Sequence, residues 1–232
     1  MAVAENAKNP WLATRTADGD AYDANYERRE TAGENVHGEA DFIERYHPRS
    51  VLDAGCGAGR HLLPLLQGGF LVWGVDRETP VLKVLKARLP AAGPPAHLIQ
   101  ADLQRLPFRA SQFDLVISIN VINHGDRQAF HCYCREMDGV LRPGGHLFIY
   151  VSPWEFVEHV RLPQTRELEP GTLVEIDTPD GDLVHHFPTA EELRARFPGY
   201  QLHRWETILA PIPFMAGAEL PQLVFWAQKQ GK

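Results

Sequence analysis

Three carboxylates stand where expected strands end in the first half of the chain. Asp53 precedes the glycine-rich turn 55–59, Asp76 follows the apolar run 70–75, and Asp102 follows the short run 97–100. The carboxyl ends of parallel strands meet at one edge of a sheet, where ligands bind. The three glycines of the turn remove side chains and permit positive φ angles, so a ligand can approach the backbone amides. This pattern predicts a slot lined by amides and acidic groups.

A dinucleotide is the first alternative ligand for a glycine-rich turn between a strand and a helix. Its fingerprint, Gly-x-Gly-x-x-Gly/Ala, fails here because the third small position falls on Arg60 when counted from Gly55 and on Leu62 when counted from Gly57. An acidic turn also suits a cationic ligand better than a pyrophosphate. A tight turn that binds nothing is the second alternative.

Five segments between residues 50 and 151 resemble, in order, the motifs of class I (Rossmann-like) S-adenosylmethionine-dependent methyltransferases of the generic small-molecule subgroup. They are the acidic turn 53–59, the strand ending in Asp76, the segment 101–108, the run 113–124, and Leu141-Arg-Pro-Gly-Gly145 before an apolar strand. Together they are more specific than any single motif. The resemblance implies S-adenosylmethionine as the cofactor and S-adenosylhomocysteine as its product.

The resemblance also implies roles for individual residues. The turn would surround the methionine part of the cofactor, with Asp53 near its ammonium group, and Asp76 would accept hydrogen bonds from the two ribose hydroxyls. Asp102 would accept from the adenine amino group, while the amide of Leu103 faces the ring. The expected cofactor-binding residues are Asp53, Gly55, Cys56, Gly57, Gly59, Asp76, Arg77, Asp102, Leu103 and Asn120.

Short apolar runs alternate with amphipathic segments through the first two thirds of the chain, which predicts repeated βα units. The expected strands begin at Val51, 70, 97, 113 and 146, and the expected helices span 60–67, the segment after an N-cap at Thr79, and the segment from Asp126 to Leu141. The family fold that the resemblance implies is α/β and three-layered. It is a Rossmann-like methyltransferase fold with a seven-stranded, mostly parallel sheet whose last strand is antiparallel.

We expect one methyltransferase domain over residues 1–232, built from four parts. They are an N-terminal helical cap (1–47), a cofactor-binding core (48–151), an inserted hairpin that forms a lid (152–188), and a closing helix with two strands, 201–209 and 222–228 (189–232). The hairpin is expected from runs 172–177 and 182–187, which flank an Asp-Gly turn. A capping box at Thr189 predicts the start of the closing helix.

His124 is the candidate catalytic residue, because it lies just beyond the run 113–119 at the edge of the sheet where ligands bind. A hydroxyl nucleophile would need such a base, whereas a thiolate would not. The alternative is that His124 only hydrogen-bonds its own loop. The Asn/Asp-Pro-Pro-Tyr/Phe motif of amine-modifying relatives is absent, since the corresponding stretch begins at Asn120 and reads Asn-Val-Ile-Asn.

The expected substrate-binding residues are Tyr22 and Tyr26 in the cap and Trp154 and His185 in the insertion. Ordinary packing is the alternative for both tyrosines. No metal is expected, because His185 and its neighbour 186 would need further ligands that the sequence does not identify. The pair at positions 132 and 134 lacks the two-residue gap of a cysteine zinc site.

The 232 residues carry a formal charge of −7, so the average surface repels phosphate backbones. We therefore expect a small-molecule acceptor and no nucleic acid, in a monomer or a homodimer. Because the segment 117–124 resembles the same strand of tRNA wobble-uridine methylases, an RNA substrate is one alternative, and a non-catalytic cofactor-binding regulatory module is another. The odd number of cysteines, three, predicts a reducing compartment. Because the sequence has no apolar run of ~20 residues and no leader-like start, we expect a cytoplasmic protein without membrane contact.

Overall fold

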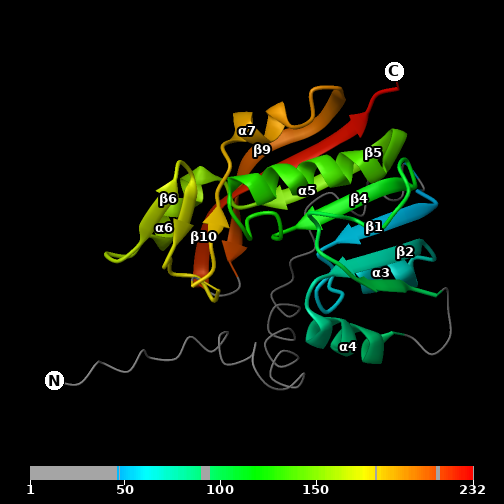
Figure 1. The fold of residues 1–232 in the computed structure, drawn as a ribbon, viewed down its shortest axis with the longest axis horizontal. Helices are drawn as coiled ribbons and strands as arrows, with labels where there is room; N and C mark the ends of the chain where they lie inside the picture. The colour runs from blue at the N-terminus through cyan, green and yellow to red at the C-terminus, as the bar shows by residue number, and fades with distance from the viewer. Residues whose placement is uncertain (1–45, 47, 90–94, 181, 213–214, 232) are drawn as a thin grey trace.

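A seven-stranded sheet forms the centre of the protein (Figure 1). The computed structural model describes residues 46, 48–89, 95–180, 182–212 and 215–231. The sheet order is β3-β2-β1-β4-β5-β10-β9. The strands are β1 (Ser50–Ala54), β2 (Leu71–Asp76), β3 (His97–Gln100), β4 (Phe113–Ile119), β5 (Leu141–Val151), β9 (Tyr200–Ile212) and β10 (Met215–Lys229).

The first five strands of the sheet are parallel, and β10 is antiparallel to both of its neighbours, β5 and β9. This topology confirms the predicted fold, including the antiparallel last strand. The crossover between β3 and β4 moves the chain to the other side of β1, so the sheet order reverses there. The carboxyl ends of β1 and β4 therefore border a topological switch point, where α/β proteins bind ligands.

Helices cover both faces of the sheet because neighbouring side chains on a buried strand point to opposite sides. Leu52 packs into an apolar cluster with α5 (Arg127–Val140) and α7 (Ala190–Ala195), whereas Val51 packs with α3 (Leu62–Gln67) and α4 (Thr79–Arg88). β4 is almost fully buried, as its continuous apolar run predicts. The two clusters make a three-layer core that holds the strand ends rigidly in place.

The helix α5 begins and packs as its sequence predicts. The side chain of Asp126 accepts a hydrogen bond from the amide of Ala129 at 2.8 Å and caps the helix. The apolar positions of the helix face the sheet, and Cys134 lies buried among them, which accounts for that cysteine as core packing. α5 thereby fixes the loop that leads into it from β4.

Several predicted boundaries were wrong. α3 begins at Leu62 instead of residue 60, and Thr79 lies inside α4, whose N-cap is Glu78. β5 begins at Leu141 and includes the Pro143-Gly144 stretch that was predicted to end the preceding helix. The pairing of β5 with β4 is irregular there, and Gly144 has a φ of 76°. β9 and β10 extend beyond the predicted closing strands, since two long antiparallel neighbours satisfy each other's backbone groups.

The segment 152–188 carries its own small antiparallel sheet beside the main one (Figure 1). It contains η2 (Trp154–Phe156), α6 (Val157–Val160), β6 (Arg166–Glu169), β7 (Thr172–Val174) and β8 (His185–His186). β7 pairs with β8 as the hairpin prediction requires, but a longer connection replaces the tight Asp-Gly turn. β7 ends before Glu175, which adopts a φ of 61°. β6 was not predicted because its four residues are exposed and show no apolar alternation.

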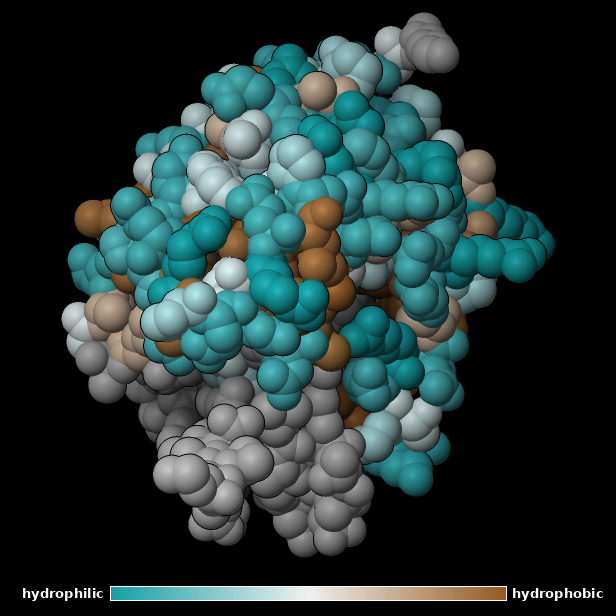
Figure 2. Space-filling model, turned by 60° about the vertical axis from the view of Figure 1, so that its left-hand side comes forward, coloured by the Kyte–Doolittle hydropathy of each residue, from teal (hydrophilic) through white to brown (hydrophobic). Residues whose placement is uncertain are grey.

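The predicted cap, residues 1–47, lies outside the described residues apart from Tyr46. Within the described part, no helix has the length and apolar character needed to cross a membrane. Figure 2 shows one face of the protein on which hydrophilic residues predominate and hydrophobic residues gather only in small groups.

Asp114 at the start of β4 holds the beginning of β1. Its Oδ2 accepts hydrogen bonds from the amides of Arg49 at 2.7 Å and Ser50 at 2.8 Å, and the carboxylate forms an ion pair with Arg142. Partial burial would raise the pKa of Asp114, but the hydrogen bonds from Ser50 and Arg49 and the charge of Arg142 together lower it. The ionised carboxylate therefore stabilises the junction of β1, β4 and β5.

We expect Asp114→Asn to lower the free energy of unfolding at pH 7 by about 1–2 kcal/mol. A lowered pKa in the folded state gives stability that is present above the ordinary pKa of 3.8 and is lost as the pH falls through the folded-state value. Urea denaturation should therefore show a difference in the free energy of unfolding between wild type and variant, and this difference should become smaller below pH 4. An equal difference at pH 7 and pH 3 would contradict this assignment.

Candidate functional site

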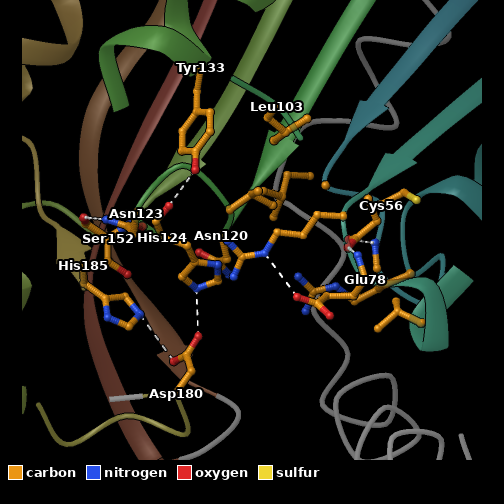
Figure 3. A pocket seen from close by; sticks show the side chains of 18 of the residues that line it. Cys56, Glu78, Leu103, Asn120, Asn123, His124, Tyr133, Ser152, Asp180 and His185 are labelled. Carbon is orange, nitrogen blue, oxygen red and sulfur yellow. Dashed lines mark hydrogen bonds and ion pairs between the residues drawn. The ribbon is translucent and has the colours of Figure 1, made fainter. Parts of the chain in front are cut away.

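A cavity of 320 Å³ opens over the carboxyl ends of the central strands. Its lining comes from the glycine-rich turn, the end of β2, the segment after β3, the loop between β4 and α5, and the inserted segment. Figure 3 shows these side chains facing a common space, with His185 and Asp180 on one side and Cys56 and Glu78 on the other. The cavity therefore lies at the switch point of the sheet.

The structure brings most of the predicted site residues to this cavity. Those that line it are Gly55, Cys56, Gly57, Asp76, Arg77, Asp102, Leu103, Asn120, His124 and His185. Asp53, Gly59 and Trp154 do not belong to the lining, and Trp154 packs on an apolar cluster of the inserted segment instead. Tyr22 and Tyr26 lie outside the described residues.

The three glycines of the turn serve different purposes. Gly55 has a φ of 89°, and a Cβ there would lie 2.4 Å from Cγ1 of Val121, while a Cβ on Gly59 would lie 2.3 Å from Cδ1 of Leu85. Packing within the protein therefore favours glycine at 55 and 59, and this reason stands beside the predicted one that the glycines leave space for a ligand. Gly57 lines the cavity with a φ of 52°, and its amide donates to Asp76.

Asp53 is buried, and its charge affects the Cys56 thiol at the cavity wall. It lies in β1 with 2% of its surface exposed, and it does not belong to the cavity lining. Burial, and then the charges of Asp53 and Asp76, raise the pKa of the Cys56 thiol well above its ordinary value. Cys56 is therefore a neutral thiol, unsuited to act as a nucleophile at neutral pH.

Asp76 ends β2 with both carboxylate oxygens turned to backbone amides. Oδ2 accepts from Gly57 at 3.0 Å and Oδ1 accepts from Glu78 at 2.9 Å. Burial raises the pKa of Asp76, and these two amides offset only part of that effect. An incompletely compensated carboxylate at the cavity wall favours a ligand that donates hydrogen bonds to it.

Asp102, Leu103 and Asn120 complete this end of the cavity. The Oδ1 of Asp102 accepts from the amide of Gln104 at 2.8 Å, which holds the turn after β3. Leu103 presents a mostly buried apolar surface to the cavity. Asn120 has a φ of 55°, an uncommon backbone conformation for a residue other than glycine, and such strain is concentrated at functional sites.

His124 forms the other end of the cavity together with Asp180 and His185 (Figure 3). Nε2 of His124 lies 2.9 Å from Oδ2 of Asp180, and Nε2 of His185 lies 3.5 Å from Oδ1 of the same carboxylate. Burial would raise the pKa of Asp180, but hydrogen bonds to both imidazoles lower it far below its ordinary value. Asp180 is therefore a carboxylate anion between two imidazoles.

Backbone pairing places these groups together. His124 and His185 form an isolated antiparallel bridge, and the amide of Gly125 donates to the carbonyl of Val184 at 2.8 Å. The amide of His186 donates to the carbonyl of Asn123 at 2.8 Å. The loop after β4 and the inserted segment are thus joined as a short ladder across the end of the sheet.

Side chains reinforce that ladder. The hydroxyl of Tyr133 on α5 donates to the carbonyl of His124 at 2.8 Å. The amide group of Asn123 donates to the carbonyls of Ser152 at 2.9 Å and His186 at 2.8 Å. The position of His124 is therefore fixed by the helix and by the inserted segment, which begins at Ser152 directly after β5.

The adjacent histidines 185 and 186 separate into different environments. His185 joins Asp180 at the cavity, whereas His186 is fully buried and contacts Thr172 Oγ1 at 2.9 Å and Glu192 Oε2 at 3.2 Å. Asp180 was not predicted as a site residue, because the Thr178-Pro-Asp-Gly stretch has the residue types of a tight turn. Only the turn chemistry of that stretch was visible in the sequence.

Known proteins match the part of the chain that forms the parallel strands. Residues 51–145 match a family model described as a methyltransferase domain. The "Probable tRNA methyltransferase 9B" of Bos taurus is 36% identical over 116 residues, which is 49% of this chain and 24% of that protein. The chain thus spans about a quarter of the length of this relative.

Solved structures share the fold over most of the chain. A SAM-dependent methyltransferase from Methanosarcina mazei superposes with a TM-score of 0.68 at 21% identity, over 82% of this chain and 98% of the other. A second structure is the 1,6-didemethyltoxoflavin-N1-methyltransferase of Burkholderia thailandensis with S-adenosylhomocysteine bound. It has a TM-score of 0.61 at 21% identity, over 99% of this chain and 94% of the other. Family match and fold together confirm the predicted resemblance to class I methyltransferases.

We expect Gly55→Ala to lower the free energy of unfolding by about 1–3 kcal/mol, since the new Cβ meets Val121 and the positive φ is unfavourable. In the double variant with Val121→Ala the two losses should be less than additive, because the clash is removed and only the φ penalty stays. Gly69→Ala is the control, with a φ of 83° and no atom within 4 Å. Strictly additive losses in urea denaturation would show that Val121 does not restrict position 55.

Proposed function

We propose that this chain, which contains the methyltransferase domain of the class I enzymes, transfers the methyl group of S-adenosylmethionine to a small-molecule acceptor. The observation that carries the proposal is one cavity with two chemically different ends. The glycine-rich turn, Asp76 and Leu103 form one end, and His124 with Asp180 forms the other. Donor and acceptor could then lie side by side within a single space.

The residues at the first end fit the cofactor. When bound, S-adenosylmethionine supplies a methyl group on a positively charged sulfur. Asp76 would accept hydrogen bonds from the ribose hydroxyls, since its carboxylate is only partly compensated by backbone amides. Asp102 would accept from the adenine amino group and Leu103 would contact the ring. Gly57 leaves the backbone open beside the methionine portion.

The residues at the second end fit a small acceptor with an apolar body and a polar edge. The apolar lining comes from Phe156, Phe187 and Ile212, and the polar lining comes from Asn123, Ser152 and Gln222. Methyl transfer mainly requires that nucleophile, methyl carbon and sulfur lie in line, so positioning by these side chains would supply much of the catalysis. His124 is the proposed residue at which a hydroxyl acceptor loses its proton, and segment 152–188 is the proposed substrate lid.

Calorimetry with S-adenosylmethionine and S-adenosylhomocysteine tests the cofactor assignment. We expect both to bind the wild-type chain and Asp76→Asn to bind each roughly tenfold to a hundredfold more weakly, because a charged hydrogen-bond acceptor is lost. Glu158→Gln should bind like wild type, since Glu158 is exposed and lies outside the cavity lining. Absence of binding heat from the wild type with either compound would exclude the proposed function.

Replacing His124 tests the acceptor end. We expect His124→Ala to lower kcat by about 100-fold or more on hydroxyl acceptors, measured as release of S-adenosylhomocysteine across a panel of phenols and aliphatic alcohols. The Kd for S-adenosylmethionine should stay within twofold, because His124 lies at the far end of the cavity from Asp76. An unchanged kcat would leave His124 with the loop-supporting role only.

A tRNA substrate is the second candidate, supported by the relative named as a probable tRNA methyltransferase and by others named as tRNA U34 carboxymethyltransferases. These relatives do not support the expectation that nucleic acid is excluded. The charge of −7 favours the small molecule. Binding of tRNA that weakens steeply with salt, with methyl incorporation into the RNA, would favour the second candidate. Cofactor binding without any turnover would favour the regulatory module.

A further inference from the structure

We propose that His124, Asp180 and His185 bind a divalent transition-metal cation of the Zn²⁺ type at the acceptor end of the cavity. The three side chains come from the loop after β4 and from the inserted segment, and all of them line the cavity. Figure 3 shows the two imidazoles and the carboxylate turned toward one another. Two imidazoles and one carboxylate are a donor set that suits Zn²⁺ and its neighbours in the first transition row.

The three groups are close enough to share one ion. One ligand atom from each residue can be chosen so that all three lie within 4.8 Å of one another. Nε2 of His124 lies 2.9 Å from Oδ2 of Asp180, and Nε2 of His185 lies 3.5 Å from the other carboxylate oxygen, Oδ1. Bonds of ~2.1 Å to a common ion put neighbouring ligand atoms about 3.0–3.4 Å apart at octahedral or tetrahedral angles. The limit of 4.8 Å is longer than these separations, so the side chains would close around the ion to complete the site.

The hydrogen bond of the His185 ring supplies a second observation. Its Nδ1 lies 3.0 Å from the carbonyl oxygen of Leu183, which can only accept, so Nδ1 donates to it. This bond fixes the ring so that Nε2 faces Oδ1 of Asp180 at 3.5 Å. Only 5% of the His185 side chain is exposed, so the ring is held in place at the cavity wall.

The same hydrogen bond has the form found at metal sites. A histidine that ligates a metal through one nitrogen usually donates its other ring N–H to a carbonyl or carboxylate, which fixes the tautomer. The carbonyl of Leu183 fills that role for His185. Nε2 is thereby directed at the carboxylate that would share the ion.

A second group of two imidazoles and a carboxylate in this protein also contains an arginine. Glu192 contacts His186 at 3.2 Å and His131 at 3.4 Å, and Arg127 also contacts it at 2.6 Å. The guanidinium supplies the positive charge there. Asp180, within the part of the chain that the structure describes, contacts two imidazoles and no lysine or arginine. The position that Arg127 fills beside Glu192 therefore has no counterpart beside Asp180.

Catalytic zinc sites typically have three protein ligands and leave a coordination position open to a cavity, whereas structural zinc sites have four protein ligands. The role of the ion in methyl transfer rests on the proposed function. An acceptor hydroxyl that binds the cation would lose its proton to water. Its oxygen would then form the bond to the methyl carbon, and the C–S bond would break with both electrons left on sulfur. One proton is released per transfer, no redox change occurs, and His124 then serves as a ligand instead of a base.

The test uses the untagged, full-length chain after removal of metal with EDTA, followed by dialysis against Zn²⁺ and elemental analysis. We expect one Zn²⁺ per chain, and Co²⁺ in its place should give the visible absorption of a coordinated ion. Asp180→Asn and His185→Gln should each weaken Zn²⁺ binding at least 100-fold, because changes in outer-shell partners alone cost 10- to 100-fold. His159→Gln, an exposed histidine of the inserted segment outside the cavity lining, should bind like wild type.

Calorimetry with S-adenosylmethionine on the same samples separates this proposal from the proposed function and shows that the variants are folded. Stoichiometric Zn²⁺ with no heat from S-adenosylmethionine would keep the cation site and exclude the methyltransferase function. Heat from S-adenosylmethionine with less than a tenth of an equivalent of Zn²⁺ would overturn the cation site. Zn²⁺ binding that is unchanged in both Asp180→Asn and His185→Gln would overturn it as well.

Discussion

The short backbone ladder between the loop after β4 and the inserted segment is the interaction on which the proposed acceptor end of the cavity depends. The bridge of His124 with His185 and the hydrogen bond from Gly125 to Val184 join two parts of the chain that are distant in sequence. Because backbone groups of both strands are satisfied by this pairing, neither segment can leave without exposing buried donors and acceptors. The ladder therefore holds three titratable side chains at fixed separations beside the cavity.

The proposed cofactor end of the cavity depends on close packing. Gly55 lies against Val121, so the glycine-rich turn and the loop after β4 fit together only when position 55 has no side chain. Gly59 has the same relation to Leu85 on α4. These contacts fix the turn between β1 and α3, and they leave Gly57 and Asp76 at the cavity surface. The two ends of the cavity share the loop after β4, so disturbing either end would affect the alignment of donor and acceptor.

Much of the fold could be predicted because its signals are local. Buried parallel strands are continuous apolar runs such as 113–119, the α5 helix has an apolar face and an Asp126 cap, and strand-end carboxylates follow from chain order. The predicted boundaries were wrong where backbone pairing overrides local preference, as in β5, which continues through Pro143 and Gly144. The exposed strand β6 carries no apolar pattern at all, so sequence periodicity could not reveal it.

The sequence by itself determined the class of fold, the position of the glycine-rich turn, and the carboxylates at 76 and 102 that face the cavity. Tertiary structure alone decided that Asp53 is buried in β1, that Asp180 stands between two imidazoles, and that His185 and His186 face different surroundings. The physical reason is that composition and periodicity report whether a residue is buried and on which face of its own element. They do not report which distant side chain it meets, because that depends on how separate segments pair and pack.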